Sequence, residues 1–290
     1  MKKIGLTLGG GGAKGFAHIP VLEVFDELGI KPYCMTGSSI GAILGALYAA
    51  NHSARDIGQM IDDLIIKPRK SSLKDLFRNR DSFKFLQLID PQFSLKPKGL
   101  IKGDKLLQFL SEQLGIDTFE ELSIPLKAVA TDFWRKEQVV FSQGELMVAL
   151  RATMAIPFVF TPVTWQDRVL VDGGLANPVP HDLLSAACDI RIAVNILGTS
   201  TKPKTKTPTP LQSMLNTCEI MQSIMAKDKL ANHPVDIYLQ PPITDIEMLD
   251  FHKAEIICQQ GQKVKDDFKR QLAHLLEAPT PERAEIRSTP

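Results

Sequence analysis

The chain has 290 residues, 44% of them hydrophobic, which is enough to bury the core of one large α/β domain or of two small ones. Thirty-four Lys and Arg against thirty-three Asp and Glu give a formal charge of +1, which excludes a dedicated nucleic-acid binder with a broad basic surface. The four cysteines are far apart without C-x-x-C spacing, which argues against a disulfide framework and against a zinc site.

The first half of the chain alternates short apolar runs with helical patterns. Residues 3–8 predict a buried strand, 9–15 a glycine loop, and 16–28 a helix that ends at Gly29. A second unit of the same kind follows, with a strand at 33–36, a turn at 37–41 and a helix at 40–50. Further on, the patterns predict helices at 53–66, 103–114 and 145–153, and strands at 126–132, 138–141 and 168–171.

The second half predicts fewer elements. Residues 190–196 form an apolar run typical of a buried parallel strand, whereas 199–210 contain no apolar residue and predict a mobile loop. A helix at 211–230, a strand at 235–239 and a long helix at 251–276 complete the pattern. The alternation predicts an α/β fold with a mainly parallel central sheet and helices on both sides. We expect one domain over 1–278 and a flexible tail over 279–290.

Export and membrane signals are weak. The start, Met1-Lys2-Lys3, imitates the basic end of a signal peptide, but the apolar run at 4–8 is too short for one. No stretch reaches the ~18 consecutive apolar residues of a membrane-spanning helix. We expect a soluble, cytoplasmic protein with at most peripheral membrane contact.

The glycine loop matches G-x-G-x-x-G at Gly10, Gly12 and Gly15, between a strand and a helix as dinucleotide sites require. The next strand, however, ends in Gly37-Ser38-Ser39 without the acid that would bind a ribose. Lys14 precedes the last glycine, so the phosphate-loop pattern fails too. The loop can still present backbone N–H groups to an anion such as a tetrahedral oxyanion, or it can be a packing turn.

The turn Gly37-Ser38-Ser39-Ile40-Gly41 is G-x-S-x-G between a predicted strand and helix, which is the context of a nucleophile elbow. The spacing selects Ser39 over Ser38, and the alternative is a serine that caps the helix. Because consecutive βα units place their strands side by side, the glycine loop should lie beside Ser39. A nucleophile and oxyanion donors are two of the three parts of an acyl-transfer site.

The third part, a base, is harder to assign. Asp172 ends a predicted strand and is followed by Gly173-Gly174, a turn that lets the carboxylate face a cleft, although D-G turns are common. A histidine base would follow the serine in an α/β-hydrolase. None of the later histidines has a telling context: His52, His181, His233, His252 and His274.

Taken in order, Gly10 to Gly15, Gly37 to Gly41 and Asp172-Gly173-Gly174 resemble the patatin-like phospholipase family. The resemblance covers about the first two-thirds of the chain. It extends to Ala17-His18-Ile19 with Val21-Leu22, to the segments 149–152 and 154–157, and to Asn177-Pro178-Val179-Pro180. It implies a patatin-like fold related to the α/β-hydrolases. Pro20 stands where relatives often carry glycine, at a place in the helix where proline is tolerated.

The resemblance also implies the chemistry. Ser39 would attack an acyl carbonyl, Asp172 would take its proton without a histidine, and the N–H groups of Gly10, Gly11 and Gly12 would hold the oxyanion. Lys14 matches a basic position expected to fix the loop or the electrostatics of the site. No cofactor and no metal are implied. The remaining motif residues support these groups: Gly15, Gly37, Gly41, Gly173 and Gly174.

The expected substrates are acyl esters of phospholipids or lysophospholipids. A thioesterase or acyltransferase on the same site, a non-enzymatic regulator on this scaffold and, least favoured, a dinucleotide oxidoreductase are the alternatives. The cap-like stretch 67–105 has a local charge of +7, from eleven Lys and Arg against four Asp, and several phenylalanines. It predicts either contact with anionic lipid headgroups or a solvated cover over the site.

Overall fold

The computed structural model describes residues 2–65, 103–198 and 207–278. Three predictions therefore fall wholly or mostly outside the described residues. These are the tail 279–290, the basic stretch 67–105 except for its last three residues, and the loop 199–210 except for its last four.

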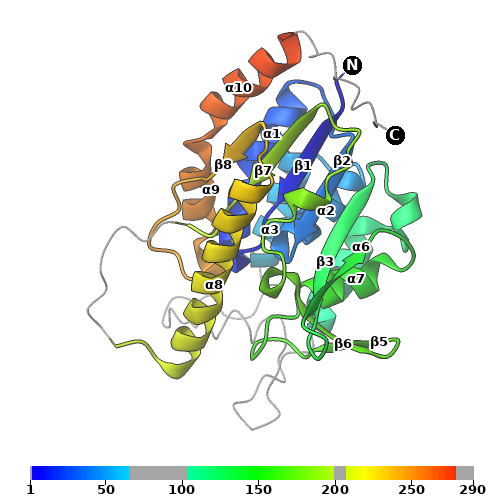
Figure 1. Cartoon of the computed structure of the whole chain (residues 1–290), viewed down its shortest axis with the longest axis vertical. Coiled ribbons are helices and arrows are strands. Elements are labelled where there is room, and N and C mark those ends of the chain that lie inside the picture. The colour runs from blue at the N-terminus through cyan, green and yellow to red at the C-terminus, as the bar shows by residue number, and fades with distance from the viewer. Residues whose placement is uncertain (1, 66–102, 199–206, 279–290) are drawn as a thin grey trace, which may run out of the picture.

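The described strands form one eight-stranded sheet in the order β5-β6-β3-β2-β1-β7-β8, with β4 paired to β3 (Figure 1). The pairs β1–β2, β1–β7, β2–β3 and β7–β8 are parallel, and β3–β4, β3–β6 and β5–β6 are antiparallel. The strand bounds are β1 Ile4–Leu8, β2 Cys34–Ser38, β3 Leu126–Asp132, β4 Glu137–Phe141, β5 Val163–Trp165, β6 Arg168–Asp172, β7 Ile190–Val194 and β8 Ile237–Leu239.

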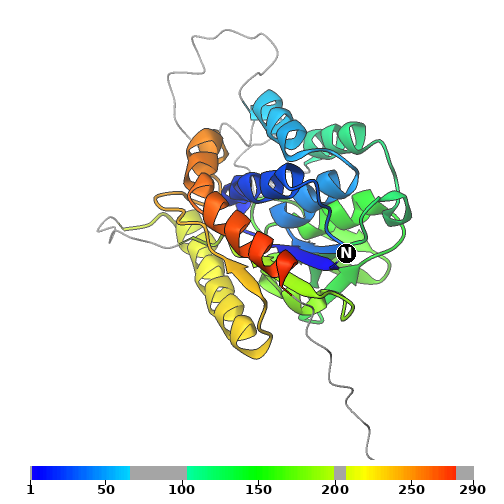
Figure 2. The ribbon, with the colours of Figure 1, turned by 90° about the horizontal axis from the view of Figure 1, so that it is seen from above.

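Helices cover both faces of this sheet, which confirms the predicted layered α/β fold. Seen from above, α1, α2 and α3 lie on one face and α8 crosses the other (Figure 2). The helix bounds are α1 Ile19–Glu27, α2 Ile40–Ala49, α3 Ala54–Ile65, α6 Asp104–Leu114, α7 Leu146–Thr153, α8 Pro210–Asn232, α9 Ala254–Gln262 and α10 Lys265–Glu277.

The core follows from strands that are apolar on both faces. Leu6 and Leu8 of β1 are fully buried, and Met35 of β2 is 1% exposed. Helix α2 is buried from Gly41 to Ala49 because the strands β1, β2 and β3 and the helices α3, α6 and α7 all pack against it. Its many small residues let these neighbours approach closely, which explains why a helix at the centre of the molecule carries no polar face.

Most predicted elements are confirmed to within a few residues, and two differ for physical reasons. The predicted helix at 16–28 begins as a 3-10 helix, Gly12–His18, before α1. The prediction of one helix over 251–276 is wrong, because the chain turns between α9 and α10. Gly261 of α9 lies against Ala17, and the turn beyond it lets Phe268 and Leu272 of α10 reach the core. Strand β5 was not predicted.

One edge of β3 is shared by two strands. β4 pairs along 128–132, so β2 and β6 both use the opposite edge, β2 at 126–129 and β6 at 130–132. Because β6 is antiparallel to β3 and β2 is parallel, their carboxyl ends point toward each other. Ser38 pairs with Val129 and Asp172 with Ala130. The residues that follow β2 and end β6 therefore meet on adjacent positions of β3.

Two helical glycines differ sharply in their surroundings, which gives a test of the packing. An alanine at Gly41 would place its Cβ 2.6 Å from the Gly9 carbonyl oxygen, whereas one at Gly58 of α3 meets no atom within 4 Å. We expect Gly41→Ala to lower the free energy of unfolding by about 3 kcal/mol and Gly58→Ala to raise it by about 1 kcal/mol. Denaturation in urea measures both. Shifts of the same sign would contradict this packing.

Candidate active site

Ser39 sits in the tight turn between β2 and α2 with φ 51° and ψ −127°, a left-handed conformation that costs a non-glycine residue energy. Its N–H donates to the Thr153 hydroxyl at 2.8 Å, and that hydroxyl donates to the Val129 carbonyl. The Ser39 side chain makes no capping hydrogen bond to α2, so the helix-cap interpretation is wrong. Thr153, which the sequence did not single out, holds the strained turn in place.

The Ser39 hydroxyl donates to Oδ2 of Asp172 at 2.6 Å. The other carboxylate oxygen, Oδ1, accepts from the Gly174 N–H at 2.7 Å. Ser39 and Asp172 are 4% and 5% exposed. The Asp172 backbone is also fixed, because its N–H donates to the Ala155 carbonyl and its carbonyl accepts from Thr131. The predicted pair is thus brought together, with both carboxylate oxygens engaged.

Burial raises the pKa of Asp172 to about 6, and the hydrogen bonds from Ser39 and Gly174 oppose that rise. The carboxylate is ionised at neutral pH, and it is a stronger base than an exposed aspartate because its proton is bound more tightly. A base works best when its pKa approaches the working pH. The poor solvation of Asp172 therefore makes it a better base toward a hydroxyl than an exposed aspartate would be.

No histidine in the described part of the chain hydrogen-bonds to Ser39 or Asp172. His18 is fully buried, and burial lowers its pKa to about 4, so the ring is neutral. Its Nε2 lies 2.9 Å from the Gly9 carbonyl oxygen, where it donates and steadies the start of the glycine loop. His181 is buried too and contacts the Val179 carbonyl.

The three predicted oxyanion donors differ in what their N–H groups do. The Gly10 N–H donates to the Pro178 carbonyl at 2.8 Å. Within the described ranges, the N–H groups of Gly11 and Gly12 have no protein acceptor, and both residues line the same cavity as Ser39. Gly11 and Gly12 are therefore the pair able to receive an anion. Gly10 instead joins the loop to the predicted Asn177-to-Pro180 motif.

The glycine loop is supported from behind by the segment 241–250, which the sequence analysis left without a role. The Ala13 N–H donates to the Met248 carbonyl at 2.8 Å. Gly12 has φ +59°, and a Cβ there would lie 2.6 Å from Cγ of Met248, so only glycine fits. Both contacts come from Met248, which is far from the loop in sequence and belongs to none of the motifs.

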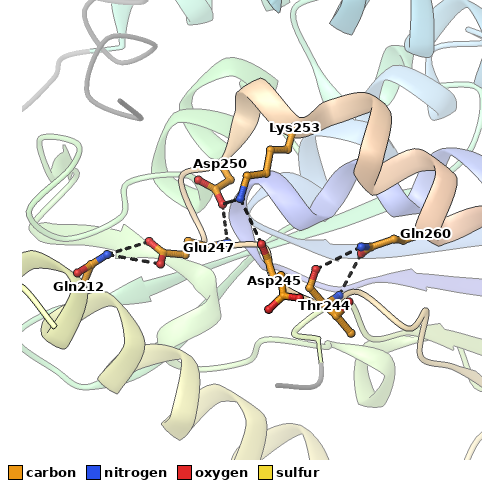
Figure 3. Close-up of polar contacts among 7 residues, drawn as sticks. All are labelled: Gln212, Thr244, Asp245, Glu247, Asp250, Lys253 and Gln260. Atoms are coloured by element: carbon orange, nitrogen blue, oxygen red, sulfur yellow. Dashed lines mark hydrogen bonds and ion pairs between the residues drawn. The ribbon is translucent and has the colours of Figure 1, made fainter. Parts of the chain in front are cut away.

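Polar contacts fix this supporting segment at three points (Figure 3). The side chain of Gln212, at the start of α8, donates to Glu247 at 3.2 Å. The Lys253 ammonium pairs with Asp250 at 2.7 Å. The Gln260 amide of α9 bonds both the N–H and the carbonyl of Thr244, at 3.0 and 3.2 Å. The segment is therefore tied to α8 on one side and to α9 on the other.

Lys14 is buried and forms an ion pair with Glu219 of α8. It also donates to the Leu197 carbonyl at 3.1 Å. The Glu219 carboxylate compensates the buried charge of the Lys14 ammonium, and the pair joins the glycine loop to α8.

The remaining motif glycines are sites of close approach. A Cβ at Gly37 would lie 2.6 Å from the backbone of Ala42, and one at Gly173 would lie 2.8 Å from the Ser38 hydroxyl. At Gly15 and Gly174 it would meet Ile40 and the Gln222 amide. Bulk at any of these positions would displace the serine turn or the aspartate.

A cavity of about 20 Å³, room for roughly one water molecule, lies beside Ser39 and Asp172. Its walls are the glycine loop, Ile156 and Pro157, and one face of α8. From α8 it is lined by Met214, Leu215, Cys218 and Gln222. The walls are largely apolar, so a hydrocarbon chain suits them better than a charged ligand.

Among the described residues, no three His, Cys, Asp or Glu side chains gather closely enough to bind a metal. The four cysteines are free thiols. None of the helices in the described part of the chain is both long and apolar enough to span a membrane. A buried serine, an aspartate hydrogen-bonded to it and two available N–H groups can together perform acyl transfer.

A family model described as patatin-like phospholipase matches residues 6–185. The chain is 32% identical over 202 residues to an uncharacterized NTE family protein of Mycobacterium tuberculosis, which covers 69% of this chain and 51% of that protein. It is 25% identical over 295 residues to the lysophospholipase NTE1 of Pyricularia oryzae, covering 93% of this chain but 19% of the fungal protein. The chain thus spans about half the length of its mycobacterial relative and a smaller share of the fungal one.

Among solved structures, the fold resembles that of VipD from Legionella pneumophila, with a TM-score of 0.50. The match covers 93% of this chain and 66% of VipD at 14% sequence identity. At that identity the likeness concerns the fold alone.

The raised pKa of Asp172 predicts how stability depends on pH. The unfolded carboxyl titrates near 3.8 and the folded one near 6, so the stability that protonated Asp172 contributes is complete below pH 3.8 and lost as pH rises through 6. Relative to wild type, Asp172→Asn should therefore gain about 2 kcal/mol in free energy of unfolding between pH 4 and pH 7. Denaturant titrations across this range measure the difference. A difference independent of pH would contradict the burial of this carboxylate.

Proposed function

Because this chain belongs to the patatin-like phospholipase family, we propose that it is a serine acyl hydrolase that cleaves acyl esters of phospholipids or lysophospholipids through Ser39 and Asp172. The proposal rests chiefly on the 2.6 Å hydrogen bond from Ser39 to a buried aspartate whose pKa is raised to about 6. A serine that served only packing would need neither a strained backbone nor a poorly solvated base.

In the first half-reaction the Ser39 hydroxyl attacks the ester carbonyl carbon while its proton passes to Oδ2 of Asp172. The carbonyl oxygen becomes an oxyanion, and the N–H groups of Gly11 and Gly12 receive it. When the intermediate collapses, the bond to the alcohol breaks, and Asp172 returns the proton to the departing oxygen. The product alcohol leaves and the acyl group remains on Ser39.

In the second half-reaction a water molecule attacks the acyl-serine and gives its proton to Asp172. The same two N–H groups hold the second oxyanion, and its collapse releases the fatty acid while the proton returns to Ser39. The Gly174 N–H keeps the Asp172 carboxylate oriented through both halves. One residue thus acts alternately as base and acid, as a dyad requires.

The substrate class is supported by the apolar cavity walls and by the relatives, of which the fungal proteins are described as lysophospholipases. A thioester or another acyl acceptor would use the same acyl-serine and differ in the leaving or accepting group. Comparing ester, thioester and phospholipid turnover separates these activities. A regulator without catalysis would bind lipid but turn over none of the three.

Ser38 provides a matched control for the nucleophile. Its hydroxyl is buried beside Ser39 and has no hydrogen-bond partner among the described residues. We expect a fluorophosphonate probe to label wild type and Ser38→Ala, and to leave Ser39→Ala unlabelled, because only Ser39 is next to the base. Mass spectrometry of the labelled peptide locates the adduct. Ester hydrolysis that survives in Ser39→Ala would refute the mechanism.

The pH dependence of turnover tests the base. Because Asp172 must be ionised to accept a proton, kcat/KM should rise with pH and reach half its plateau near pH 6. Asp172→Asn should lower kcat by about 10³-fold and remove this step, while the protein remains folded. Rates on a soluble short-chain ester between pH 4.5 and 8 measure both. An unchanged profile in Asp172→Asn would assign the titration to another group.

A further inference from the structure

Helix α8 is apolar on two opposite sides. Its inner side lines the cavity with Leu215 and Cys218. Its outer side carries an outer stripe, defined as Ile220, Met221 and Ile224, whose side chains are 53%, 58% and 63% exposed. A surface helix of a globular protein normally pairs one apolar face with one polar face. The outer stripe is thus a departure that the packing of the described residues does not explain.

The charge pattern of α8 is equally unusual. From Pro210 to Ala226 the helix has a single charged residue, Glu219, and that side chain is turned inward to pair with Lys14. The exposed positions beside the outer stripe are polar but uncharged. They are Ser213, Asn216 and Thr217. Helix α10, by contrast, exposes several charged side chains to solvent. The helix that covers the site thus has an outward face without charge from Pro210 to Ala226.

Another exposed apolar side chain, Phe158, directly follows two residues that line the cavity. Phe158 is 57% exposed and has φ 69°, a conformation that is an outlier for a bulky residue. It follows Ile156 and Pro157, which line the same cavity as α8. Backbone strain that keeps a phenylalanine in water needs a compensating role. Exposed apolar groups therefore stand on both of the elements that border the cavity.

The occupant of this surface can be argued from its size and charge. A stable protein interface buries about 800 Å² on each partner, more than four partly exposed side chains offer, which disfavours a second copy of this chain. An uncharged helix face with protruding Ile and Met side chains, together with the exposed Phe158, suits the boundary between headgroups and acyl chains of a lipid layer. Such a layer would lie against the helix whose other side lines the cavity of Ser39.

We propose that the outer stripe of α8, together with Phe158, docks on a lipid surface. The proposal rests on the proposed function, because it supplies the partner from which Ser39 would receive its acyl substrate. The cavity holds about one water, so an acyl chain enters only when α8 or the segment of Phe158 shifts. The Lys14–Glu219 pair and the Gln212–Glu247 bond then act as the attachments around which α8 moves.

Vesicle flotation tests the docking surface. The variant Ile220→Ser/Met221→Ser/Ile224→Ser removes the outer stripe, and Ile256→Ser on α9, 49% exposed in the wild type, is the matched control. With phosphatidylcholine vesicles we expect wild type and Ile256→Ser to float, and the triple variant to bind at least ten-fold more weakly. Circular dichroism checks that all three are folded. A Phe158→Ser variant should weaken binding in the same direction.

Three results would overturn the proposal. Wild type that does not float, or a triple variant that floats as well as wild type, excludes lipid docking through α8. A wild type that sediments as a dimer, with a monomeric triple variant, assigns the surface to a second copy of the chain.

Activity on two substrates separates this proposal from the proposed function. The triple variant should hydrolyse a soluble short-chain ester within two-fold of wild type and lose at least ten-fold on vesicle phospholipid. If wild type hydrolyses neither substrate but floats with vesicles, and the triple variant does not float, docking is supported and catalysis by Ser39 is refuted. Hydrolysis of vesicle phospholipid unchanged by the triple substitution would refute docking and leave the catalytic proposal intact.

Discussion

The hydrogen bond from Ser39 to Asp172 depends on one strand edge that two segments occupy end to end. β2 fills the edge of β3 as far as Val129, and β6 takes it over at Ala130. Hydrogen-bonding positions on a strand are fixed by its pleat, so neither segment can slide without losing its pairing. The serine that leaves β2 and the aspartate that ends β6 are therefore held at contact distance by backbone bonds rather than by their own side chains.

Val129 is the point at which these constraints converge. Its carbonyl accepts the Thr153 hydroxyl, and the same hydroxyl accepts the Ser39 N–H. Gly173 passes so close to this carbonyl that any side chain there would be excluded. The cost of the strained Ser39 backbone is thus offset by contacts from three separate segments, which is how a fold retains an unfavourable conformation at a functional position. Burial of Asp172 is a second cost of the same site, because an ionised carboxylate is poorly solvated there.

Local patterns in the sequence were sufficient to mark Ser39 and the glycine loop as candidates, because sharp turns leave glycines at fixed spacing, whereas Asp172 was assigned as the base through the family resemblance. They could not find Thr153 or Met248, whose contributions are a hydroxyl and a carbonyl on distant segments. Lys14 was marked by its motif, yet its partner Glu219 lies 205 residues away and belongs to no motif. The sequence could not show that the Gly10 N–H is occupied while those of Gly11 and Gly12 are available, because this depends on where the Pro178 carbonyl lies.

The same limit applied to the fold. Strands that are buried on both faces were predicted well, since a continuous apolar run is a strong signal. β5 has three residues and pairs with its neighbour in a hairpin, which is too short for a periodic pattern. The break between α9 and α10 contains no proline, and the spacing of apolar residues continues across it. The break results from packing of α9 on the 3-10 helix at Gly12–His18, which the local sequence does not reveal.

The support that Met248 gives to the glycine loop has a consequence for the newly made chain. Translation produces Ser39 about 200 residues before Met248, a delay of roughly 10 to 40 s at ordinary rates of synthesis. During that interval the segment that positions the Ala13 N–H, and the helix that covers the cavity, are not yet both in place. The order of synthesis thus leaves Ser39 without the finished glycine loop until Met248 has been made. A chain arrested before β8 would contain Ser39 and Asp172 but lack the carbonyl of Met248 that supports the glycine loop.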